Sequence, residues 1–330
     1  MLEKKFDIIG VGSPVVDSLA HVSEDFVAGI SGEKGGMELV SAEQMANMIN
    51  NIDGEVLQAA GGSAGNTVFG LAKLGLKSAF VGKLGNCEAA AFYRTEFEKL
   101  GGDSSRFKIG DIANARCLSL VTPDTERTMR TDLGASAMLA ANELSSEDFA
   151  DARHVHVEGY VLFNRDLMMA TLKAAKEAGC TISLDLASFE VVGAAKDILD
   201  SILDQYIDVV FANEEEAAAY AGVQVSDQDS VRQLGGKCEI AVVKLGKDGS
   251  LIFNNGDLIK IEPVKAQAID TTGAGDLWAT GFLYGWLKGR PLKECGDYGS
   301  VVASEVVSIL GTSLPDQTWQ QRIFPALNLA

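Results

Sequence analysis

The chain has 330 residues, of which 47% are hydrophobic and 22% charged, values typical of globular proteins and not of disordered or fibrous ones. With 46 acidic and 28 basic residues the formal net charge is −18, which repels phosphate backbones and anionic lipids, so we expect no nucleic-acid and no membrane partner. The five cysteines are scattered without a C-x-x-C pair, which argues against a disulfide framework and a zinc site.

The N-terminal segment is charged, and the apolar run that follows, Ile8–Gly12, is shorter than the ~7–15 residues of a secretory signal. We therefore expect a cytoplasmic protein. The run belongs to a first predicted strand, Phe6–Gly12. The next loop begins with Gly10-x-Gly12 like a dinucleotide fingerprint, but Val15 replaces the third glycine, so a dinucleotide-dependent oxidoreductase is kept only as an alternative. Asp17 either accepts hydrogen bonds from a polyol or is a solvated turn carboxylate.

Two regions of polar alternation, 15–39 and 106–133, predict one small β-sheet that covers the main domain as a lid. Within the second region, Ala115–Val121 and Arg127–Thr131 are expected as antiparallel strands. Arg127 is a candidate contact for a transferring phosphate when the lid closes, although a solvated strand residue is the ordinary expectation. The large α/β domain is expected over residues 1–14, 40–105 and 134–330.

A glycine-rich segment, Ala60–Asn66, leads into a predicted helix that ends before Gly75. Gly61 and Gly62 permit the backbone to approach a ligand closely, and Asn66 offers a donor and an acceptor for a hydroxyl group. An ordinary glycine-rich helix entrance explains the segment nearly as well. A P-loop is rejected, because the nearest match has its glycines inside the helix and its lysine one place late.

From about residue 154 to residue 245, strand-like runs alternate with helical patterns, which is typical of βαβ units. This rhythm predicts a mostly parallel sheet with helices on both faces. The predicted strands are His154–Gly159, Thr181–Leu186, Asp208–Ala212 and Ile240–Leu245, and the predicted helices are Asp166–Ala178, Val192–Leu203 and Glu214–Tyr220.

Polar groups follow two of these strands. Asn213 and Glu216 lie three residues apart at the start of a helix, where they can hold a hydrated Mg²⁺ through oxygen ligands or simply form an acidic helix N-terminus. The segment Lys244–Gly249 leaves another strand through a glycine-bounded turn. It is either an edge of a nucleotide pocket or a plain hairpin turn.

The segment Asp270–Asp276 reads DTTGAGD and precedes an apolar helical run. Small residues at a helix start leave the first backbone N–H groups open to an anion that gathers charge during a reaction. Asp276, in the first turn, is placed to take a proton from a hydroxyl group beside the same anion hole. A single Asp at a helix start usually only complements the helix dipole, but the whole TTGAGD run favours chemistry.

Together these segments resemble the PfkB family of the ribokinase superfamily, over about residues 6–314. The segments Gly61–Gly75 and Asp270–Gly289 resemble the two family signatures, and Asn213-x-x-Glu216 resembles its N-x-x-E motif. The adenosine kinase-like branch is the most similar, through Gly12–Asp17, Glu126–Thr128 and Ala303–Gly311.

The resemblance implies a ribokinase-like α/β fold with a small β lid, and ATP-dependent phosphorylation of a primary hydroxyl on a sugar or nucleoside, by a monomer or a homodimer. It implies Asp276 as the base and Gly273, Ala274 and Gly275 as the anion hole. The implied acceptor site comprises Asp17, Gly62, Asn66, Ser13 and Tyr160, with Arg127 from the lid. The implied ATP site comprises Asn213, Lys244, Gly246, Gly249, Thr272 and Gly275. Mg²⁺ is implied at Asn213 and Glu216 through water, and a monovalent cation such as K⁺ at Asp270 and Thr272.

The chain departs from the family pattern at three positions that bear on its ligands. Ser13 stands where an Asn is usual, Lys244 stands where a Thr is usual, and Tyr160 is a single aromatic residue where a Phe pair is frequent. Nucleoside and plain sugar acceptors therefore both stay open. A non-catalytic sugar or nucleotide sensor on the same fold is a further alternative, against which the intact Gly273–Asp276 element counts.

Overall fold

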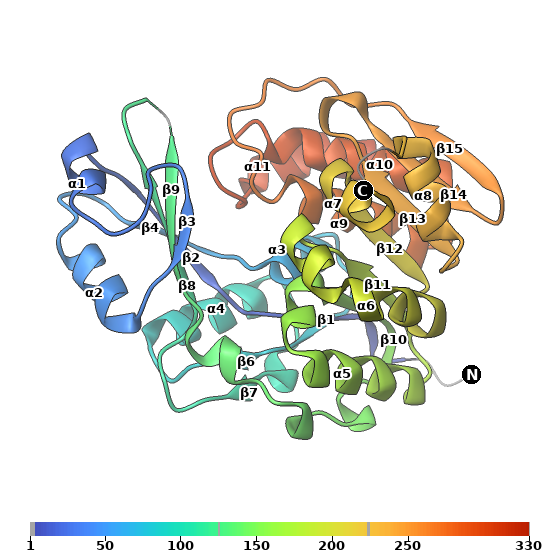
Figure 1. Cartoon of the computed structure of the whole chain (residues 1–330), viewed down its shortest axis with the longest axis horizontal. Coiled ribbons are helices and arrows are strands. Elements are labelled where there is room, and N and C mark those ends of the chain that lie inside the picture. The colour runs from blue at the N-terminus through green and yellow to red at the C-terminus, as the bar shows by residue number, and fades with distance from the viewer. Residues whose placement is uncertain (1–3, 125, 223–224, 330) are drawn as a thin grey trace.

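The computed structural model of the chain describes residues 4–124, 126–222 and 225–329. In this part, eight strands form one large sheet in the order β15-β14-β13-β12-β11-β10-β1-β5 (Figure 1). The strands are β1 (Phe6–Val11), β5 (Ser78–Val81), β10 (Ala152–Glu158), β11 (Thr181–Asp185), β12 (Val209–Asn213), β13 (Ile240–Lys244), β14 (Ser250–Asn254) and β15 (Asp257–Ile261). All pairs from β5 to β13 are parallel, and β14 and β15 add an antiparallel edge. The predicted mostly parallel sheet is confirmed.

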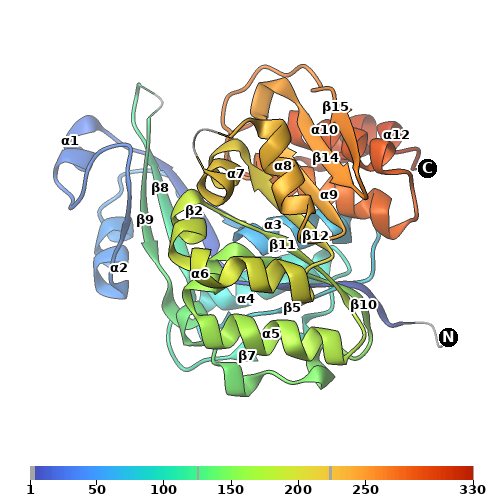
Figure 2. The same cartoon turned by 45° about the vertical axis from the view of Figure 1, so that its right-hand side comes forward.

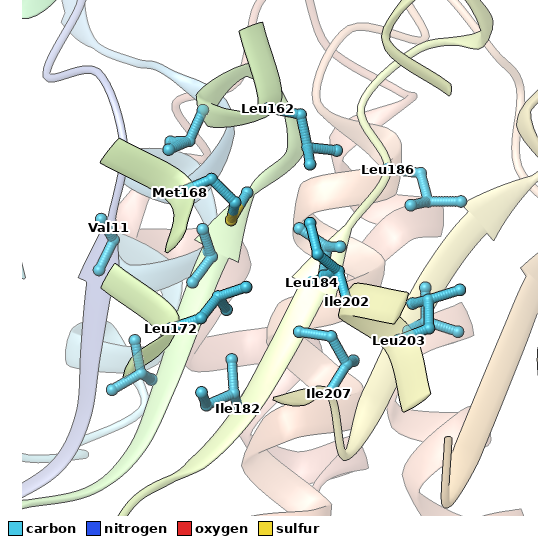
Figure 3. Close-up of a cluster of buried hydrophobic side chains, with 14 of the residues drawn as sticks. Val11, Leu162, Met168, Leu172, Ile182, Leu184, Leu186, Ile202, Leu203 and Ile207 are labelled. Atoms are coloured by element: carbon cyan, nitrogen blue, oxygen red, sulfur yellow. The ribbon is translucent and has the colours of Figure 1, made fainter. Parts of the chain in front are cut away.

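Helices cover both faces of this sheet, because its parallel strands are apolar on both sides. On one face, Ile182 and Leu184 of β11 pack with Leu172 and Leu203 from two covering helices (Figure 3). The helices of that face are α5 (Arg165–Glu177), α6 (Phe189–Tyr206), α7 (Glu214–Ala221) and α8 (Asp227–Gly235). The opposite face packs against α3 (Ser63–Lys73), α9 (Ala274–Leu287), α10 (Leu292–Val306) and the C-terminal segment, which contains α11 (Asp316–Thr318) and α12 (Phe324–Ala326) and packs through Trp319 and Ile323.

A second, five-stranded sheet stands beside the large one (Figures 1 and 2). Its order is β3-β9-β8-β2-β4, with β2 (Val16–His21), β3 (Met37–Leu39), β4 (Leu57–Ala60), β8 (Arg116–Val121) and β9 (Arg127–Asp132). The helices α1 (Glu24–Ala28) and α2 (Ala42–Asn50) pack on its outer face through Val27, Met45 and Leu118. We call these strands and the two helices the lid.

The lid differs from its predicted extent in two places. Strand β4 and helix α2 belong to it, although residues 40–60 were expected in the large domain, because β4 pairs with β2 in the lid sheet. Residues 106–109 lie outside it, since β7 (Lys108–Ile109) pairs with β6 (Lys83–Leu84) next to the large sheet. The helix α4 (Glu88–Lys99) covers this region through Tyr93 and Phe97.

The connections of β1 make a topological switch point at the carboxyl end of the large sheet, the place where open α/β sheets form a crevice. Strand β1 lies between β5 and β10, and the chain leaves it directly into lid strand β2. Ligands of open α/β sheets bind in such a crevice, outside the carboxyl ends of the strands. Among the described residues, no helix has the length and apolar character that a membrane crossing requires.

Candidate active site

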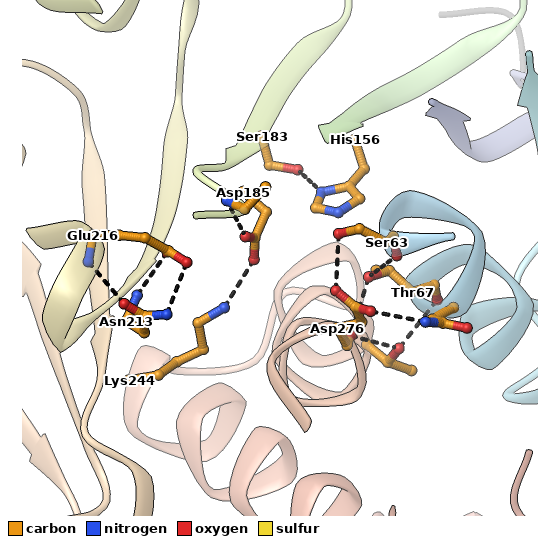
Figure 4. A network of polar contacts seen from close by, with 12 residues as sticks. Ser63, Thr67, His156, Ser183, Asp185, Asn213, Glu216, Lys244 and Asp276 are labelled. Carbon is orange, nitrogen blue, oxygen red and sulfur yellow. Dashed lines mark hydrogen bonds and ion pairs between the residues drawn. The ribbon is translucent and has the colours of Figure 1, made fainter. Parts of the chain in front are cut away.

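Asp276 lies in the first turn of α9, where Gly273 caps the helix with a left-handed φ of 70°. Two donors from the first turn of α3 hold its carboxylate. Ser63 Oγ donates a hydrogen bond of 2.9 Å to Oδ1 (Figure 4). Asn66 Nδ2 donates one of 2.9 Å to Oδ2. Burial, together with the charge of Asp185, raises the pKa of Asp276 to about 6. The predicted base is therefore held in a fixed orientation with a pKa suited to proton transfer near neutral pH.

The two glycines before α3 bring the backbone against Asp17 and Ser13. A Cβ at Gly61 would lie 2.1 Å from an Asp17 carboxylate oxygen, and a Cβ at Gly62 would lie 2.2 Å from the Ser13 carbonyl oxygen. Gly62 also has a φ of 86°, which a side chain would strain. Burial raises the pKa of Asp17 to about 7, with Asp276 adding to the effect and Arg127 opposing it. Asp17 is a half-buried residue of strand β2, and not a solvated turn residue, while its place in the acceptor site stays a prediction.

Glu158, at the end of β10, was not predicted from the sequence. Its side chain is buried and accepts hydrogen bonds from the backbone N–H groups of Ser13 (2.9 Å) and Ala64 (3.1 Å). A Cβ at Gly12 would lie 2.2 Å from its carboxylate, so Gly12 makes room for Glu158. Since β1 also continues into a strand and not into a helix, the dinucleotide-binding interpretation of Gly10-x-Gly12 is wrong.

Arg127 joins the lid to the segment before α9. Its Nη1 lies 2.8 and 2.7 Å from the two carboxylate oxygens of Asp270 and also hydrogen-bonds Thr272 Oγ1. Its Nη2 donates to Ser119 of the lid at 2.8 Å. Arg127 is thus not a solvated strand residue. It compensates the charge of Asp270, and the K⁺ site predicted at Asp270 and Thr272 stays a prediction.

Asn213 and Glu216 form a complete capping box at the start of α7. Asn213 N and Nδ2 donate to the two Glu216 carboxylate oxygens at 2.9 and 2.8 Å, and Glu216 N donates to Asn213 Oδ1 at 2.8 Å (Figure 4). Burial, reinforced by the charge of Asp185, raises the pKa of Glu216 to about 7. The pair is a structural cap, but each carboxylate oxygen of Glu216 has a second lone pair that can accept a hydrogen bond from water.

Lys244, at the end of β13, forms an ion pair with Asp185 at the end of β11. Lys244 Nζ lies 2.8 Å from Asp185 Oδ2, and both side chains are largely buried. Asp185 was not predicted either. Glu158 and Asp185 are each the last polar residue of a predicted buried strand. Because ligands of such sheets bind at the carboxyl ends of the strands, this position in the sequence could have identified both residues.

The remaining predicted residues lie in the turns that follow β10 and β13. Tyr160 follows Glu158 in a short 3-10 helix and is half exposed, and burial together with the charges of Glu158 and Asp276 raises its pKa to about 12. Gly246 and Gly249 turn the chain with φ values of 51° and 91° between β13 and β14. A cavity of about 700 Å³ opens beside this turn, and its lining includes Leu245, Lys247, Asp248, Lys260 and Pro263.

Comparisons with known proteins bear on the family and the fold of the chain. A family described as "pfkB family carbohydrate kinase" matches residues 37–319. A probable sugar kinase from Rhizobium etli CFN 42 is 29% identical, with a TM-score of 0.83 over 96% of this chain and 98% of that one. The adenosine kinase from Sinorhizobium meliloti is 29% identical, with a TM-score of 0.82 over 94% and 96% of the two chains. The 5-dehydro-2-deoxygluconokinase of Bacillus subtilis is 28% identical over 75% of this chain and 80% of its own length.

Proposed function

The chain belongs to the pfkB family of carbohydrate kinases, and we propose that it transfers the γ-phosphoryl group of ATP to a primary hydroxyl of a nucleoside. The observation that carries the proposal is the Asp276 carboxylate, oriented by Ser63 and Asn66 beside the small residues that begin α9. In the proposed step the acceptor oxygen forms a bond to the γ-phosphorus while the bond from that phosphorus to the β–γ bridging oxygen breaks. The hydroxyl proton passes to Asp276, and ADP leaves.

The start of α9 supports an anion hole. Gly275 and Asp276 are among the first residues of the helix, whose leading N–H groups have no intrahelical acceptor and carry the positive end of the helix dipole. Gly273, Ala274 and Gly275 present no bulky side chain that would keep a phosphoryl group away. The N–H group of Ala274 already donates to the Thr271 carbonyl at 3.1 Å, so we propose that the N–H groups of Gly275 and Asp276 stabilise the charge that develops on the transferred group.

We propose an ATP site along the carboxyl ends of β12 and β13, with Asn213, Lys244, Gly246, Gly249 and Thr272 as its members. A cavity of about 700 Å³ lies next to this region; it is lined by Leu245, Lys247 and Asp248 of the β13–β14 turn, and not by the five proposed members themselves. Asn213 and Glu216 would hold Mg²⁺ through water, and a cation there would favour the charged form of a carboxyl group that burial disfavours. When bound, Mg²⁺ supplies charge neutralisation at the phosphates.

The inner face of the lid favours a nucleoside over a plain sugar. Cross-strand pairing aligns Met37, Met129, Ser119, Leu19 and Leu57 in one row across the sheet. Met37 and Leu57 are more than half exposed, and this face is the one from which Arg127 reaches Asp270. Such a mostly apolar row, together with the half-exposed ring of Tyr160, suits a planar base, while the Asp17 carboxylate of the neighbouring row suits ribose hydroxyls.

The test is an ADP-release assay with Mg²⁺ on nucleosides, ribose, fructose and related sugars. We expect turnover with nucleosides to exceed turnover with free sugars, because a sugar leaves the apolar row uncovered. A preference for free sugars would overturn the acceptor class and keep the kinase. ATP hydrolysis and transfer that stay at background with every acceptor would overturn the proposed reaction.

The base is tested with Asp276→Asn. This variant is expected to fold and to bind acceptor as the wild type does, but to lose roughly 10²–10⁴-fold in kcat, the usual contribution of a general base. Asp297→Asn, which removes a surface partner of Lys293, is the matched control and should keep full activity. Undiminished turnover of Asp276→Asn would refute the base assignment.

A further inference from the structure

Lys244 reaches across the end of a strand to find its partner. Strands β11 and β13 are not neighbours, since β12 lies between them, with Asp185 beside Phe211 and Lys244 beside Asn213. Lys244 Nζ nevertheless lies 2.8 Å from Asp185 Oδ2, with the two side chains only 13% and 6% exposed (Figure 4). Lysine and aspartate are rarely buried to this extent unless they are paired, as these two are. Because each charge neutralises the other, the loss of either one leaves an unpaired buried charge.

The ammonium group also lies against the start of α9. A Cβ at Gly275 would lie 2.9 Å from Lys244 Nζ, so the lysine nitrogen touches the first turn of that helix. A helix N-terminus carries the positive end of the dipole and disfavours a neighbouring cation. Burial opposes the charged form of Lys244 as well, but Asp185 and Glu216 hold its pKa above the ordinary value, so the group stays a cation. Two positive groups therefore lie side by side, the ammonium group of Lys244 and the start of α9.

Asp185 is itself held firmly. Its Oδ1 accepts a hydrogen bond of 3.0 Å from the N–H group of Ala187, while Oδ2 accepts from Lys244. Ala187 adopts a left-handed φ of 65°, a conformation that residues other than glycine rarely adopt. The backbone at Ala187 therefore orients the Asp185 carboxylate, and this carboxylate in turn orients the ammonium group of Lys244.

We propose that Lys244 contacts the transferred phosphoryl group opposite the N–H groups of α9, and that Asp185 is the positioning residue for Lys244. The proposal rests on the proposed kinase reaction and adds to it a side-chain cation that balances charge on the phosphoryl group as the bond to the β–γ bridging oxygen breaks and the bond to the acceptor oxygen forms. The proton still passes to Asp276, and ADP leaves. A methionine, which matches the lysine in length without its charge, separates this role from packing.

Steady-state kinetics of Lys244→Met test the contact. We expect kcat to fall roughly 10²-fold, the size of effect seen when one donor to a developing charge is removed, with the acceptor KM changed less than about twofold. Lys244→Arg keeps the charge and should recover part of kcat. A kcat of Lys244→Met within about threefold of the wild type would overturn the proposal.

A double-mutant cycle tests the positioning role. Asp185→Asn alone should lower kcat roughly tenfold, the order expected when a partner that orients a functional group is lost. In the Lys244→Met background the same change should have no further effect, because Asp185 acts through the lysine. Losses that multiply would show two independent roles and overturn the assignment of Asp185. The double variant also removes both buried charges, so it serves if Lys244→Met alone fails to fold.

The matched control is the ion pair Lys176–Asp208, which has the same 2.8 Å separation but lies at the amino end of β12. Lys176→Met and Asp208→Asn should keep kcat within about twofold, even where they lower the melting temperature.

Inorganic phosphate gives a readout that needs no turnover. Phosphate at millimolar concentration should raise the melting temperature of the wild type and of Lys176→Met, but not of Lys244→Met, since a bound anion stabilises the folded state by mass action. This experiment separates the proposed role of Lys244 from the proposed kinase reaction, because it tests whether an anion binds at Lys244 even if no acceptor is phosphorylated. If phosphate does not stabilise the wild type, or stabilises Lys244→Met equally, the proposed anion contact of Lys244 is wrong.

Discussion

At the scale of single residues, the candidate site contains several carboxyl groups whose pKa values are raised. Burial is the main cause for each of Asp17, Glu158, Glu216 and Asp276, and it raises the pKa values of the first three to about 7 and of Asp276 to about 6. Carboxyl groups close together in a low dielectric disfavour one another's ionisation. Such a cluster is costly for the free protein, and it is relieved by ligands that bring hydroxyl donors and cations.

This cluster makes the stability of the unliganded protein fall as pH rises. A carboxyl group whose folded-state pKa lies above its unfolded value binds more protons in the folded state between the two values, here from about pH 4 to about pH 7. For Asp17 we expect a loss of roughly 2 kcal/mol in the free energy of unfolding between pH 5.5 and 7, since one pKa unit corresponds to about 1.4 kcal/mol. Urea unfolding at a series of pH values measures it.

The variant Asp17→Asn should flatten this pH dependence, because it removes one of the titrating groups. Asp124→Asn is the control. The pKa of Asp124 is lowered, by hydrogen bonds from Lys34 and Thr122, so its contribution lies below the pH window and the slope should not change. A wild-type stability that rises from pH 5.5 to pH 7.5 would contradict the pKa directions of the cluster.

At the scale of elements, helix α9 depends on the glycine that begins it. Gly273→Ala places a Cβ in a left-handed conformation (φ 70°) and 2.5 Å from Thr312 Cγ2, so the first turn must shift. We expect both a loss of stability of roughly 1–3 kcal/mol and a large fall in kcat, because the Asp276 carboxylate and the open N–H groups move together. Kinetics and urea unfolding of the purified variant measure the two effects.

Gly289 just beyond the other end of the same helix is the matched control. Its φ is 71°, but a Cβ there meets nothing within 4 Å. Gly289→Ala therefore carries the conformational strain alone and should keep kcat. Equal kcat values for the two variants would show that the start of α9 does not need its geometry for catalysis.

The elements of the large sheet were predictable because each one follows from local patterning. The runs at 181–186, 208–212 and 240–245 became β11, β12 and β13 within a residue or two, since buried parallel strands are apolar on both faces. Strand β4 was missed because Leu57–Ala60 is short and its partner β2 lies about 40 residues earlier. Arg127–Asp270 and Lys244–Asp185 could not be read from the sequence either, because pairings this distant depend on the assembled sheet.

At the scale of the whole molecule, the ion pair between Arg127 and Asp270 ties the lid to the segment that precedes α9. Asp270 also accepts hydrogen bonds from the N–H groups of Thr272 and Gly311, so the guanidinium binds a carboxylate that the backbone already orients. The position of the lid and the geometry of the proposed anion hole are therefore linked through Asp270.

Arg127→Met should loosen the lid. We expect faster hydrogen exchange in β8 and β9, a higher acceptor KM and a lower kcat, because the lid face no longer stays over the acceptor. Lys34→Met is the control, since Lys34 pairs with Glu24 and Asp124 inside the lid and does not join it to the large sheet. Exchange rates in Arg127→Met that match those of Lys34→Met would show that the ion pair does not hold the lid.

The two helices on the outer lid face have a consequence for how the kinase works in a cell. They cover with the chain's own residues a sheet face that would otherwise call for a neighbouring subunit, and the side chains proposed for the reaction all come from one polypeptide. We therefore expect the proposed reaction to need no side chain from a second subunit, whether the protein is a monomer or a homodimer. Its rate per molecule should survive dilution, and any assembly it joins is free to serve purposes other than completing the reaction centre.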